Sequence, residues 1–490
     1  MKRIIITLIC VLFTCIFSGS TSSAQTVKIN AANFPDAAVR EALEDWNVEE
    51  DEDGNYTKNE YIDTEEVESL FVEDTVYNIK GLDKLNKLET LGMEHYAGGN
   101  LTLNNPMLRY LTVRNCEVTS IKITAPYVTD LSVSCLSQTK NVTFCCKSMS
   151  SLWLDGENIS DIAWGEVSHL TYLNINVNQR HLDLRKLNNL EQIDLSNNKK
   201  VRTVDLSKNK KLKKFWANNT VLQKLDTRNN PKLTSLVCYS SKISSLNLTK
   251  NTQLKEITVT DAKLNKIDVS KNKKLGTLII YGNNIKKLNI ENNKNLFCLK
   301  CGGNRLSTLN VKNNKRLVDL SCSNNKIKSV NVTQNKKLIS LDVSRNPVRS
   351  LNLQQNKKLE YLSLGNTKVN ALDISKNKKL RDLDISYTRI KKLNLKEYKY
   401  LEELDISGSK LEKLTLPKRY VNIQLAGKKG KTINIAKYIG KGYSVDYISN
   451  DVLKYNKKKG NVKLIGKRGS YGYLTLTKGK RCYEISIKIK

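Results

Sequence analysis

The sequence predicts a β-rich solenoid, a coil of stacked turns with a parallel sheet, and three observations support this fold class. Leucines recur every 21 residues from Leu212 to Leu401, and asparagines share that spacing from Asn209 to Asn377. A fixed period of about 20 to 50 residues is typical of solenoids. Within each period the apolar residues lie two or three positions apart, which favours strands and tight turns over helices.

One period has the pattern LxxLxIxxNxI followed by xxLxIxxNxx, as in the segment that begins at Leu275. A single coil has one apolar stripe that it cannot bury alone, so the coils must stack. Each buried Leu or Ile contributes about 1.5–3 kcal/mol to that stacking. We therefore expect about 16 coils over residues 67–416.

The two asparagine columns predict a structural role. A stacked turn directs backbone N–H and C=O groups away from water, and each unpaired group costs about 1–3 kcal/mol. An Asn amide has both a donor and an acceptor, so a column of asparagines can satisfy these groups coil after coil. Between Thr220 and Ser409 the column of the first half-repeat contains Asn only from Asn283 to Asn346, because Thr, Ser or Ala fills the other coils of that stretch.

These motifs resemble leucine-rich repeats, in particular the nested 21-residue bacterial type called IRREKO, over residues 67–416. The resemblance implies a curved, right-handed coil whose parallel sheet lines the concave face. It also implies protein binding at a bacterial surface or with a host. The period breaks twice, with one residue missing near Leu182 and one extra residue near Lys199.

Residues 1–24 are typical of a secretory signal peptide. Lys2 and Arg3 precede an apolar run that ends at Phe17, and small residues up to Ala24 follow. The run is too short for a transmembrane helix, and no second run of spanning length follows. We expect a secreted or cell-surface protein without a transmembrane segment once the signal is removed.

Residues 25–66 predict a helical cap, because the apolar end of a solenoid must be covered. The stretch "NFPDAAVREALEDW" has helical apolar spacing. The acidic stretch after it has the ligand spacing of an EF-hand calcium loop and resembles the element found before repeats in exported bacterial proteins. A loop that caps the coil without metal is the alternative. The calcium ligands would be Glu49, Asp51, Asp53, Asn55, Thr57 and Glu60.

Residues 417–490 predict an antiparallel β-domain, because short alternating segments such as "GYLTLTKGK" are separated by Gly and Lys turns. The segment resembles bacterial Ig-like modules. Its nineteen basic and three acidic residues give a net charge of +16, whereas residues 31–74 have a net charge of −14. Such a positive charge favours an anionic cell-wall polymer as partner. A solvated lysine-rich surface is the alternative, and no nucleic-acid partner is expected for an exported protein.

The first half of each repeat contains the candidate binding surface, because its outward positions vary from coil to coil. If this half forms the concave strand, five apolar and aromatic side chains lie together over roughly 15 Å. Clustered exposed aromatics on a rigid surface are typical of binding sites. A modest apolar surface on a spacer is the alternative. We call these residues the aromatic patch: Trp216, Val237, Tyr239, Ile279 and Tyr281.

Outward carboxylates in later coils predict an acidic stripe beyond the aromatic patch, formed by Asp319, Asp342, Asp382, Asp384, Glu403 and Asp405. Nine cysteines follow the signal segment. Cys238, Cys301 and Cys322 occupy inward aliphatic positions and are expected to behave as small buried apolar residues.

The residue inventory argues against an enzyme. The three histidines lack HExxH spacing, and the chain has no GxSxG or P-loop motif. Two functions remain. One is an exported recognition module that binds a protein or a glycan through its concave face, in adhesion or host interaction. The other is a structural cell-wall spacer that its basic C-terminal region holds on anionic polymers.

Overall fold

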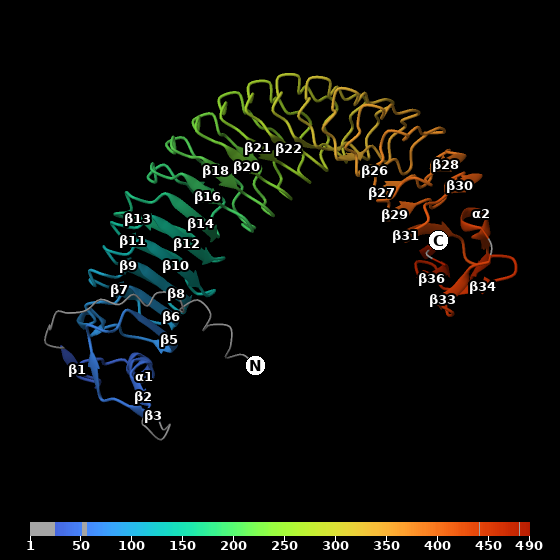
Figure 1. Ribbon diagram of the computed structural model, residues 1–490. Coiled ribbons are helices and arrows are strands. Elements are labelled where there is room, and N and C mark those ends of the chain that lie inside the picture. Colours follow the sequence, from blue (N-terminus) through green and yellow to red (C-terminus); the bar gives the residue numbers. More distant parts are fainter. Residues whose placement is uncertain (1–24, 51–55, 441, 480) are drawn as a thin grey trace, which may run out of the picture.

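The computed structural model describes residues 25–50, 56–440, 442–479 and 481–490. Figure 1 shows an arc, with a small cap at the N-terminal end and a β-rich region at the C-terminal end. The coil between them is a β-solenoid of about 17 turns, which confirms the predicted fold class with one turn more than expected. The predicted signal peptide, residues 1–24, lies outside the described residues.

The inner side of the arc is formed by one long parallel sheet, which we call the concave sheet (Figure 1). Each strand pairs with the equivalent strand of the next coil, so that Leu236 lies opposite Ile257 and Ile257 opposite Leu278. The strands are β5 (Ser69–Val76), β6 (Thr90–Tyr96), β8 (Tyr110–Cys116), β10 (Asp130–Cys135), β12 (Ser151–Gly156), β14 (Tyr172–Val177), β16 (Gln192–Asp194), β18 (Lys214–Trp216), β20 (Ser235–Val237), β21 (Glu256–Thr258), β22 (Thr277–Ile279), β23 (Cys298–Lys300), β24 (Asp319–Ser321), β25 (Ser340–Asp342), β26 (Tyr361–Ser363), β27 (Asp382–Asp384) and β29 (Glu403–Asp405).

The outer side of the arc has shorter and interrupted strands (Figure 1). These strands form three small parallel sheets. The sheets are separate because several coils cross the outer side without a regular strand. A 3₁₀ helix, η1 (Leu82–Lys84), precedes the second coil. The outer strands are β7 (Asn100–Thr102), β9 (Ser120–Thr124), β11 (Asn141–Cys145), β13 (Asp161–Trp164), β15 (His181–Asp183), β17 (Thr203–Asp205), β19 (Lys224–Leu225), β28 (Lys392–Asn394) and β30 (Lys413–Thr415).

Strand pairing shows where the repeat departs from its period. Tyr172 lies opposite Gln192, a step that is one residue shorter than the usual period. Gln192 lies opposite Lys214, a step that is one residue longer. The missing and the extra residue therefore fall in adjacent coils, as the sequence indicates, and the usual register resumes where Lys214 lies opposite Ser235.

The interior of the coil is filled by the apolar residue at the centre of each concave strand and by those on the turns. Phe215, Leu236 and Leu299 are fully buried, and the predicted inward cysteines Cys238, Cys301 and Cys322 are buried with them. Burial raises the pKa of the Cys301 thiol to about 12. These thiols therefore remain protonated and act as packing groups.

The second-half asparagine column joins each coil to the one before it. The Asn314 Nδ2 donates to the Ile290 carbonyl at 3.0 Å and to the Asn293 carbonyl at 2.9 Å, and the equivalent asparagines repeat this pair of bonds. Where Tyr398 replaces Asn, its hydroxyl donates to the Ile374 carbonyl at 2.5 Å. From Asn209 to Tyr398 the column thus gives buried backbone carbonyls a donor in addition to their backbone N–H partner, with one such bond instead of two at Tyr398.

The two columns differ in how they use the amide oxygen. In the first-half column, the Asn304 Oδ1 accepts from the Ile285 N–H while its Nδ2 donates to the Ile280 carbonyl. In the second-half column, the Oδ1 atoms of Asn209, Asn230 and Asn314 have no partner. The prediction that the amide serves as both donor and acceptor is therefore right for the first column and wrong for most of the second. Asn251 is an exception, because its Oδ1 accepts from the Thr227 hydroxyl.

The N-terminal cap packs α1 against β5 at the first coil. Asp36 joins the two with one carboxylate. Its Oδ1 accepts from the N–H of Ala38 in the first turn of α1, and its Oδ2 accepts from the N–H groups of Tyr77 and Asn78. Two antiparallel pairs, β1 with β4 and β2 with β3, complete the cap. The elements are β1 (Thr26–Lys28), α1 (Ala37–Trp46), β2 (Val48–Glu50), β3 (Tyr56–Lys58) and β4 (Tyr61–Asp63).

The C-terminal region continues the concave sheet. Its first strand, β31 (Val421–Gly427), pairs in parallel with β29 on one edge and with β37 (Arg481–Ile489) on the other. Residues 417–490 are therefore joined to the coil by strand pairing, although the sequence predicts a domain boundary at 417. The remaining pairings are antiparallel. They involve β32 (Thr432–Asn434), β33 (Ser444–Ile448), β34 (Leu453–Asn456), β35 (Asn461–Leu464) and β36 (Tyr471–Lys478); a short helix, α2 (Ala436–Ile439), contacts β30.

Replacing one asparagine of the second-half column should destabilise the coil. We expect Asn314→Ala to lower the free energy of unfolding by about 1–3 kcal/mol, because two hydrogen bonds to the buried Ile290 and Asn293 carbonyls are lost while each carbonyl keeps a backbone donor. Chemical denaturation monitored by circular dichroism measures the loss. The control is Asn313→Ala, which removes an exposed neighbour. Equal losses for the two variants would contradict a structural role for the column.

Truncation after Pro417 should make the protein self-associate. The deletion exposes the edge of β29 and the apolar end of the coil, and unpaired sheet edges pair with other chains. We expect most of the truncated protein to elute as oligomers in size-exclusion chromatography with light scattering, under conditions where the full chain is monodisperse. A monomeric truncated protein would show that the C-terminal region does not close the sheet.

Candidate binding site on the concave sheet

The concave sheet presents rows of side chains to solvent, one residue per coil. In the three-residue strands the central residue points into the coil, and its two neighbours point outward. The register aligns Trp216 with Val237, Val237 with Thr258, and Thr258 with Ile279. Three members of the aromatic patch therefore lie in one row across four neighbouring strands.

Tyr239 and Tyr281 lie in the adjacent position, two residues after Val237 and Ile279. The Tyr239 carbonyl accepts from the Asn219 N–H at 2.7 Å, and the Tyr281 carbonyl accepts from the Asp261 N–H at 2.9 Å. This pairing between coils fixes the backbone of both tyrosines. The structure therefore brings all five residues of the aromatic patch together on one face.

Exposure within the aromatic patch is uneven. The side chains of Tyr239 and Tyr281 are 46% and 45% exposed. Trp216, Val237 and Ile279 are half-buried among their neighbours on the sheet. The Lys214 ammonium lies 5.7 Å from the centre of the Trp216 ring, within range of a cation–π interaction. The patch thus has two protruding tyrosines beside a flatter apolar surface.

Two glycines of the next coil leave room for the Tyr281 ring. A Cβ added at Gly302 would come within 3.1 Å of the ring, and one at Gly303 within 3.5 Å. Gly303 also has a φ of +62°, which favours glycine. The ring therefore lies close over the backbone of the neighbouring turn, which restricts its rotamers.

The structure adds Trp153 to the same outward row. Trp153 lies opposite Asn174, which lies opposite Asp194, which in turn lies opposite Trp216. Its side chain is 53% exposed. The sequence signal is the triplet "LWL", in which an aromatic residue stands between two inward leucines. The predicted aromatic patch does not include Trp153, because the coil around this residue follows the repeat pattern only weakly.

The acidic stripe lies in the later coils of the concave sheet. Asp382 is opposite Glu403, and Asp384 is opposite Asp405, so four carboxylates face the same side on two adjacent strands. Partial burial, together with the nearby charges of Glu403, Asp384 and Asp405, raises the pKa of Asp382 to about 6. Burial also raises the pKa of Asp405. This cluster is strained by like charges at neutral pH.

A hollow of about 740 Å³ lies where the stripe meets the C-terminal strands, and Asp384, Tyr387, Asp405 and Lys490 are among the residues that line it. The Lys490 ammonium is 3.9 Å from the centre of the Tyr387 ring. The cation partly balances the local carboxylates, because its charge lowers the pKa of Asp405 against the effect of burial.

The predicted calcium ligands are not brought together among the described residues. Asp51, Asp53 and Asn55 lie outside them. Thr57 lies in β3, where it pairs with Glu49 of β2, and the Glu60 carboxylate lies 3.0 Å from the Lys28 ammonium. The described part of the chain contains no group of three or more His, Cys, Asp or Glu that could hold a metal ion. Calcium binding stays a prediction.

No protein-family model matches the chain, and no curated protein matches it in sequence. Solved structures do match. The functional domain of InlJ from Listeria monocytogenes, which is described as including a cysteine ladder, is matched over 96% of this chain and 100% of that chain, with a TM-score of 0.56 and 19% identity. A chain of the Drosophila Toll–Spatzle complex is matched over 74% of this chain and 56% of that chain, with a TM-score of 0.57 and 17% identity.

These similarities show that the chain has the leucine-rich-repeat type of fold. In this chain too, cysteines stand in equivalent positions of adjacent coils. Cys301 and Cys322 are 21 residues apart and both are buried. Among the described residues, no helix is long and apolar enough to cross a membrane.

Replacing Asp382 should stabilise the protein in a pH-dependent way. The folded-state pKa of about 6 lies above the usual value of 3.8, so the folded protein binds the proton more tightly than the unfolded chain does. The stabilisation that protonated Asp382 gives the folded protein is therefore lost as the pH rises from about 4 to 6. We expect Asp382→Asn to raise the free energy of unfolding by about 1 kcal/mol at pH 7, after allowance for solvent screening, and to have little effect at pH 4.

Thermal unfolding at pH 4, 5, 6 and 7 measures this difference. Asp319→Asn is the control, because the Asp319 carboxylate lies 3.0 Å from the Lys300 ammonium and its neutralisation should not stabilise the protein. A gain for Asp382→Asn that is the same at every pH would contradict the charge-repulsion explanation.

Proposed function

We propose that this chain is an exported, non-enzymatic recognition protein that binds a protein partner through its concave sheet. The observation that carries this proposal is the position of the aromatic patch. Its five residues come from three coils, yet they share one face of a hydrogen-bonded sheet, and two of them are tyrosines that protrude into solvent.

The physical properties of the patch suit a binding site. Tyr and Trp bring large contact areas at a low entropic cost, and they dominate measured interface energies. The Tyr281 ring is already restricted by the neighbouring turn, so little freedom remains to be lost on binding. Val237 and Ile279 add aliphatic surface between the rings, which favours a protein partner over a glycan.

The acidic stripe would supply electrostatic complementarity at the other end of the same face. Carboxylates on adjacent strands attract a basic segment of a partner and speed the encounter, while close apolar contacts slow dissociation. A partner with an apolar surface next to a basic one would match this arrangement. The self-repulsion that raises the pKa of Asp382 would be relieved when such a partner binds.

The similar structures support a recognition role. The chain of similar fold from the Toll–Spatzle complex was solved together with another protein, so this type of coil can take part in protein complexes. The secretory signal predicted over residues 1–24 places such a function at the cell surface or outside the cell, where adhesion or host interaction would occur. The open concave sheet carries carboxylates on a broad face, which suits binding better than catalysis.

The aromatic patch can be tested by removing its protruding rings. We expect the double variant Tyr239→Ala, Tyr281→Ala to weaken capture of a partner protein by at least about tenfold, because central tyrosines are typical hot spots. The melting temperature should change little, since about half of each tyrosine is exposed and neither ring fills the interior of the coil. Pull-down with the chain from residue 25 onward, followed by titration of the captured partner, measures the effect.

The control is the double variant Tyr61→Ala, Tyr400→Ala, which removes two rings that are 49% and 47% exposed but lie away from the concave sheet. Partner capture should survive in this control. If both double variants bound equally well while removal of the basic C-terminal region released the protein from cells, the spacer function would replace recognition.

A further inference from the structure

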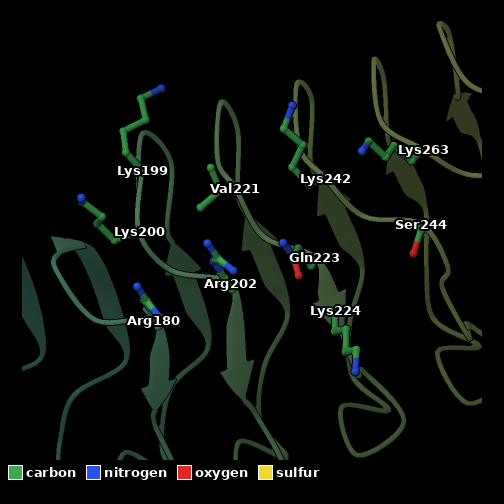
Figure 2. A pocket seen from close by; sticks show the side chains of 10 residues that line it. All are labelled: Arg180, Lys199, Lys200, Arg202, Val221, Gln223, Lys224, Lys242, Ser244 and Lys263. Atoms are coloured by element: carbon green, nitrogen blue, oxygen red, sulfur yellow. The ribbon is translucent and has the colours of Figure 1, made fainter.

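A second candidate surface lies on the outer side of the arc, opposite the concave sheet. A hollow of about 670 Å³ spans neighbouring coils around β15, β17 and β19. Figure 2 shows the side chains that line it. We call it the basic groove. It is lined by Arg180, Lys199, Lys200, Arg202, Val221, Gln223, Lys224, Lys242, Ser244 and Lys263.

The charge of the basic groove is not neutralised. Seven of its ten lining residues are Lys or Arg, and none is acidic. None of these seven forms an ion pair with any described residue of the chain. Nearby arginines behave differently, because Arg185 pairs with Asp183 at 2.7 Å and Arg228 with Asp226 at 2.6 Å. The groove therefore concentrates free positive charge that solvent or a ligand must balance.

The extra residue of the repeat lies in this groove. The coil from Gln192 to Lys214 is one residue longer than the coils that follow, and the additional residue falls where Lys199 and Lys200 stand side by side. The Lys199 ammonium donates to the Asn219 carbonyl of the next coil at 3.1 Å, which directs this lysine along the groove. The irregularity thus widens a turn at the point where it adds a cation, a feature that the structural repeat does not require.

Backbone pairing sets the spacing of the cations. The Arg202 N–H donates to the Arg180 carbonyl at 2.8 Å, and the Gln223 N–H donates to the Arg202 carbonyl at 2.9 Å. Equivalent residues of neighbouring coils therefore follow one another at about 4.8 Å or slightly more on this side of the arc. Two shorter side chains, Val221 and Ser244, also line the groove, as Figure 2 shows.

A row of basic residues continues along the outer side beyond the groove. The N–H of Lys242 donates to the Leu222 carbonyl, and that of Lys263 to the Ile243 carbonyl. The same bond to the preceding coil occurs at further basic residues, which therefore occupy the equivalent position: Arg305, Lys326, Lys368 and Arg389. The charge thus forms a track along the coils, interrupted at Asn284 and Pro347, which suits an extended ligand better than a single small anion.

We propose that the basic groove binds a linear polymer of sugar or polyol units that carries repeated sulfate or phosphate groups. Guanidinium groups bind such oxyanions through paired hydrogen bonds, and lysines add charge. A single-stranded nucleic acid fits less well, because no aromatic side chain lines the groove to stack on bases. The site lies on the face opposite the aromatic patch, so the polymer and a concave-face partner could be bound together.

Binding of three probes to the chain from residue 25 onward tests this proposal: a heparin oligosaccharide, a poly(glycerol phosphate) chain and an oligothymidine. The groove variant is Lys200→Glu, Arg202→Glu, Lys242→Glu. Its matched control is Lys336→Glu, Lys337→Glu, Lys357→Glu, which makes the same change in net charge at exposed lysines of other turns. Isothermal titration calorimetry at about 0.15 M salt measures affinity where long-range attraction is screened.

We expect the groove variant to lose at least about tenfold in affinity for heparin or for poly(glycerol phosphate), and the control variant less than about threefold. Loss with heparin alone identifies a sulfated glycan, loss with poly(glycerol phosphate) alone identifies a phosphodiester polymer, and either result supports the proposal. Melting temperatures confirm that both variants fold. Should the Glu variant fail to fold, the neutral set Lys200→Gln, Arg202→Gln, Lys242→Gln replaces it with the same expected direction.

Three results would overturn the proposal. Equal losses in the groove and control variants would mean that binding depends on overall charge. If neither heparin nor poly(glycerol phosphate) bound measurably to the unaltered chain, the groove would not be a site for such polymers. Oligothymidine binding as tight as that of these two probes, and lost in the groove variant, would assign the groove to nucleic acid.

Discussion

The structure depends on one constraint, which is that every turn of the coil places backbone carbonyls where water cannot reach them. The asparagine columns meet this constraint with side-chain amides, as at Asn304 and Asn314. Because each amide must reach the preceding coil, the length of a coil is restricted to nearly the same number of residues throughout. The constant register of the concave sheet, and with it the alignment of outward side chains into rows, follows from this restriction.

A fixed register leaves the outward positions free to vary without cost to the fold. The same coils that bury Phe215 and Leu236 therefore carry Trp216 and Val237 on the inner face and basic residues on the outer face. Even the longer coil that begins at Gln192 keeps its concave pairing, because the extra residue is absorbed in a turn on the outer side. The packing of the interior and the composition of the surface are thus largely independent in this molecule. The concave face and the outer face can therefore change in sequence separately.

Much of this arrangement could be predicted from spacing alone. The coil, the inward cysteines and the common face of Trp216, Tyr239 and Tyr281 follow from the constant period of the leucines. Features that depend on atomic positions could not be predicted. The unpartnered Oδ1 of Asn314, the pKa of Asp382 and the hollow beside Lys199 result from distances between coils. The pairing of β31 with β29 could not be predicted either, because the sequence of β31 no longer follows the repeat.

The buried thiols have a consequence for how long the folded protein lasts. Nine cysteines of the described chain are free, and five of them are buried in the native state. In an oxidising medium a coil that opens would expose thiols that can form wrong disulfides, although a coil closes in much less time than a disulfide needs to form. Irreversible loss would then follow the fraction of molecules in which a coil is open, so the lifetime of the protein would depend on its equilibrium stability and on the strength of the oxidant.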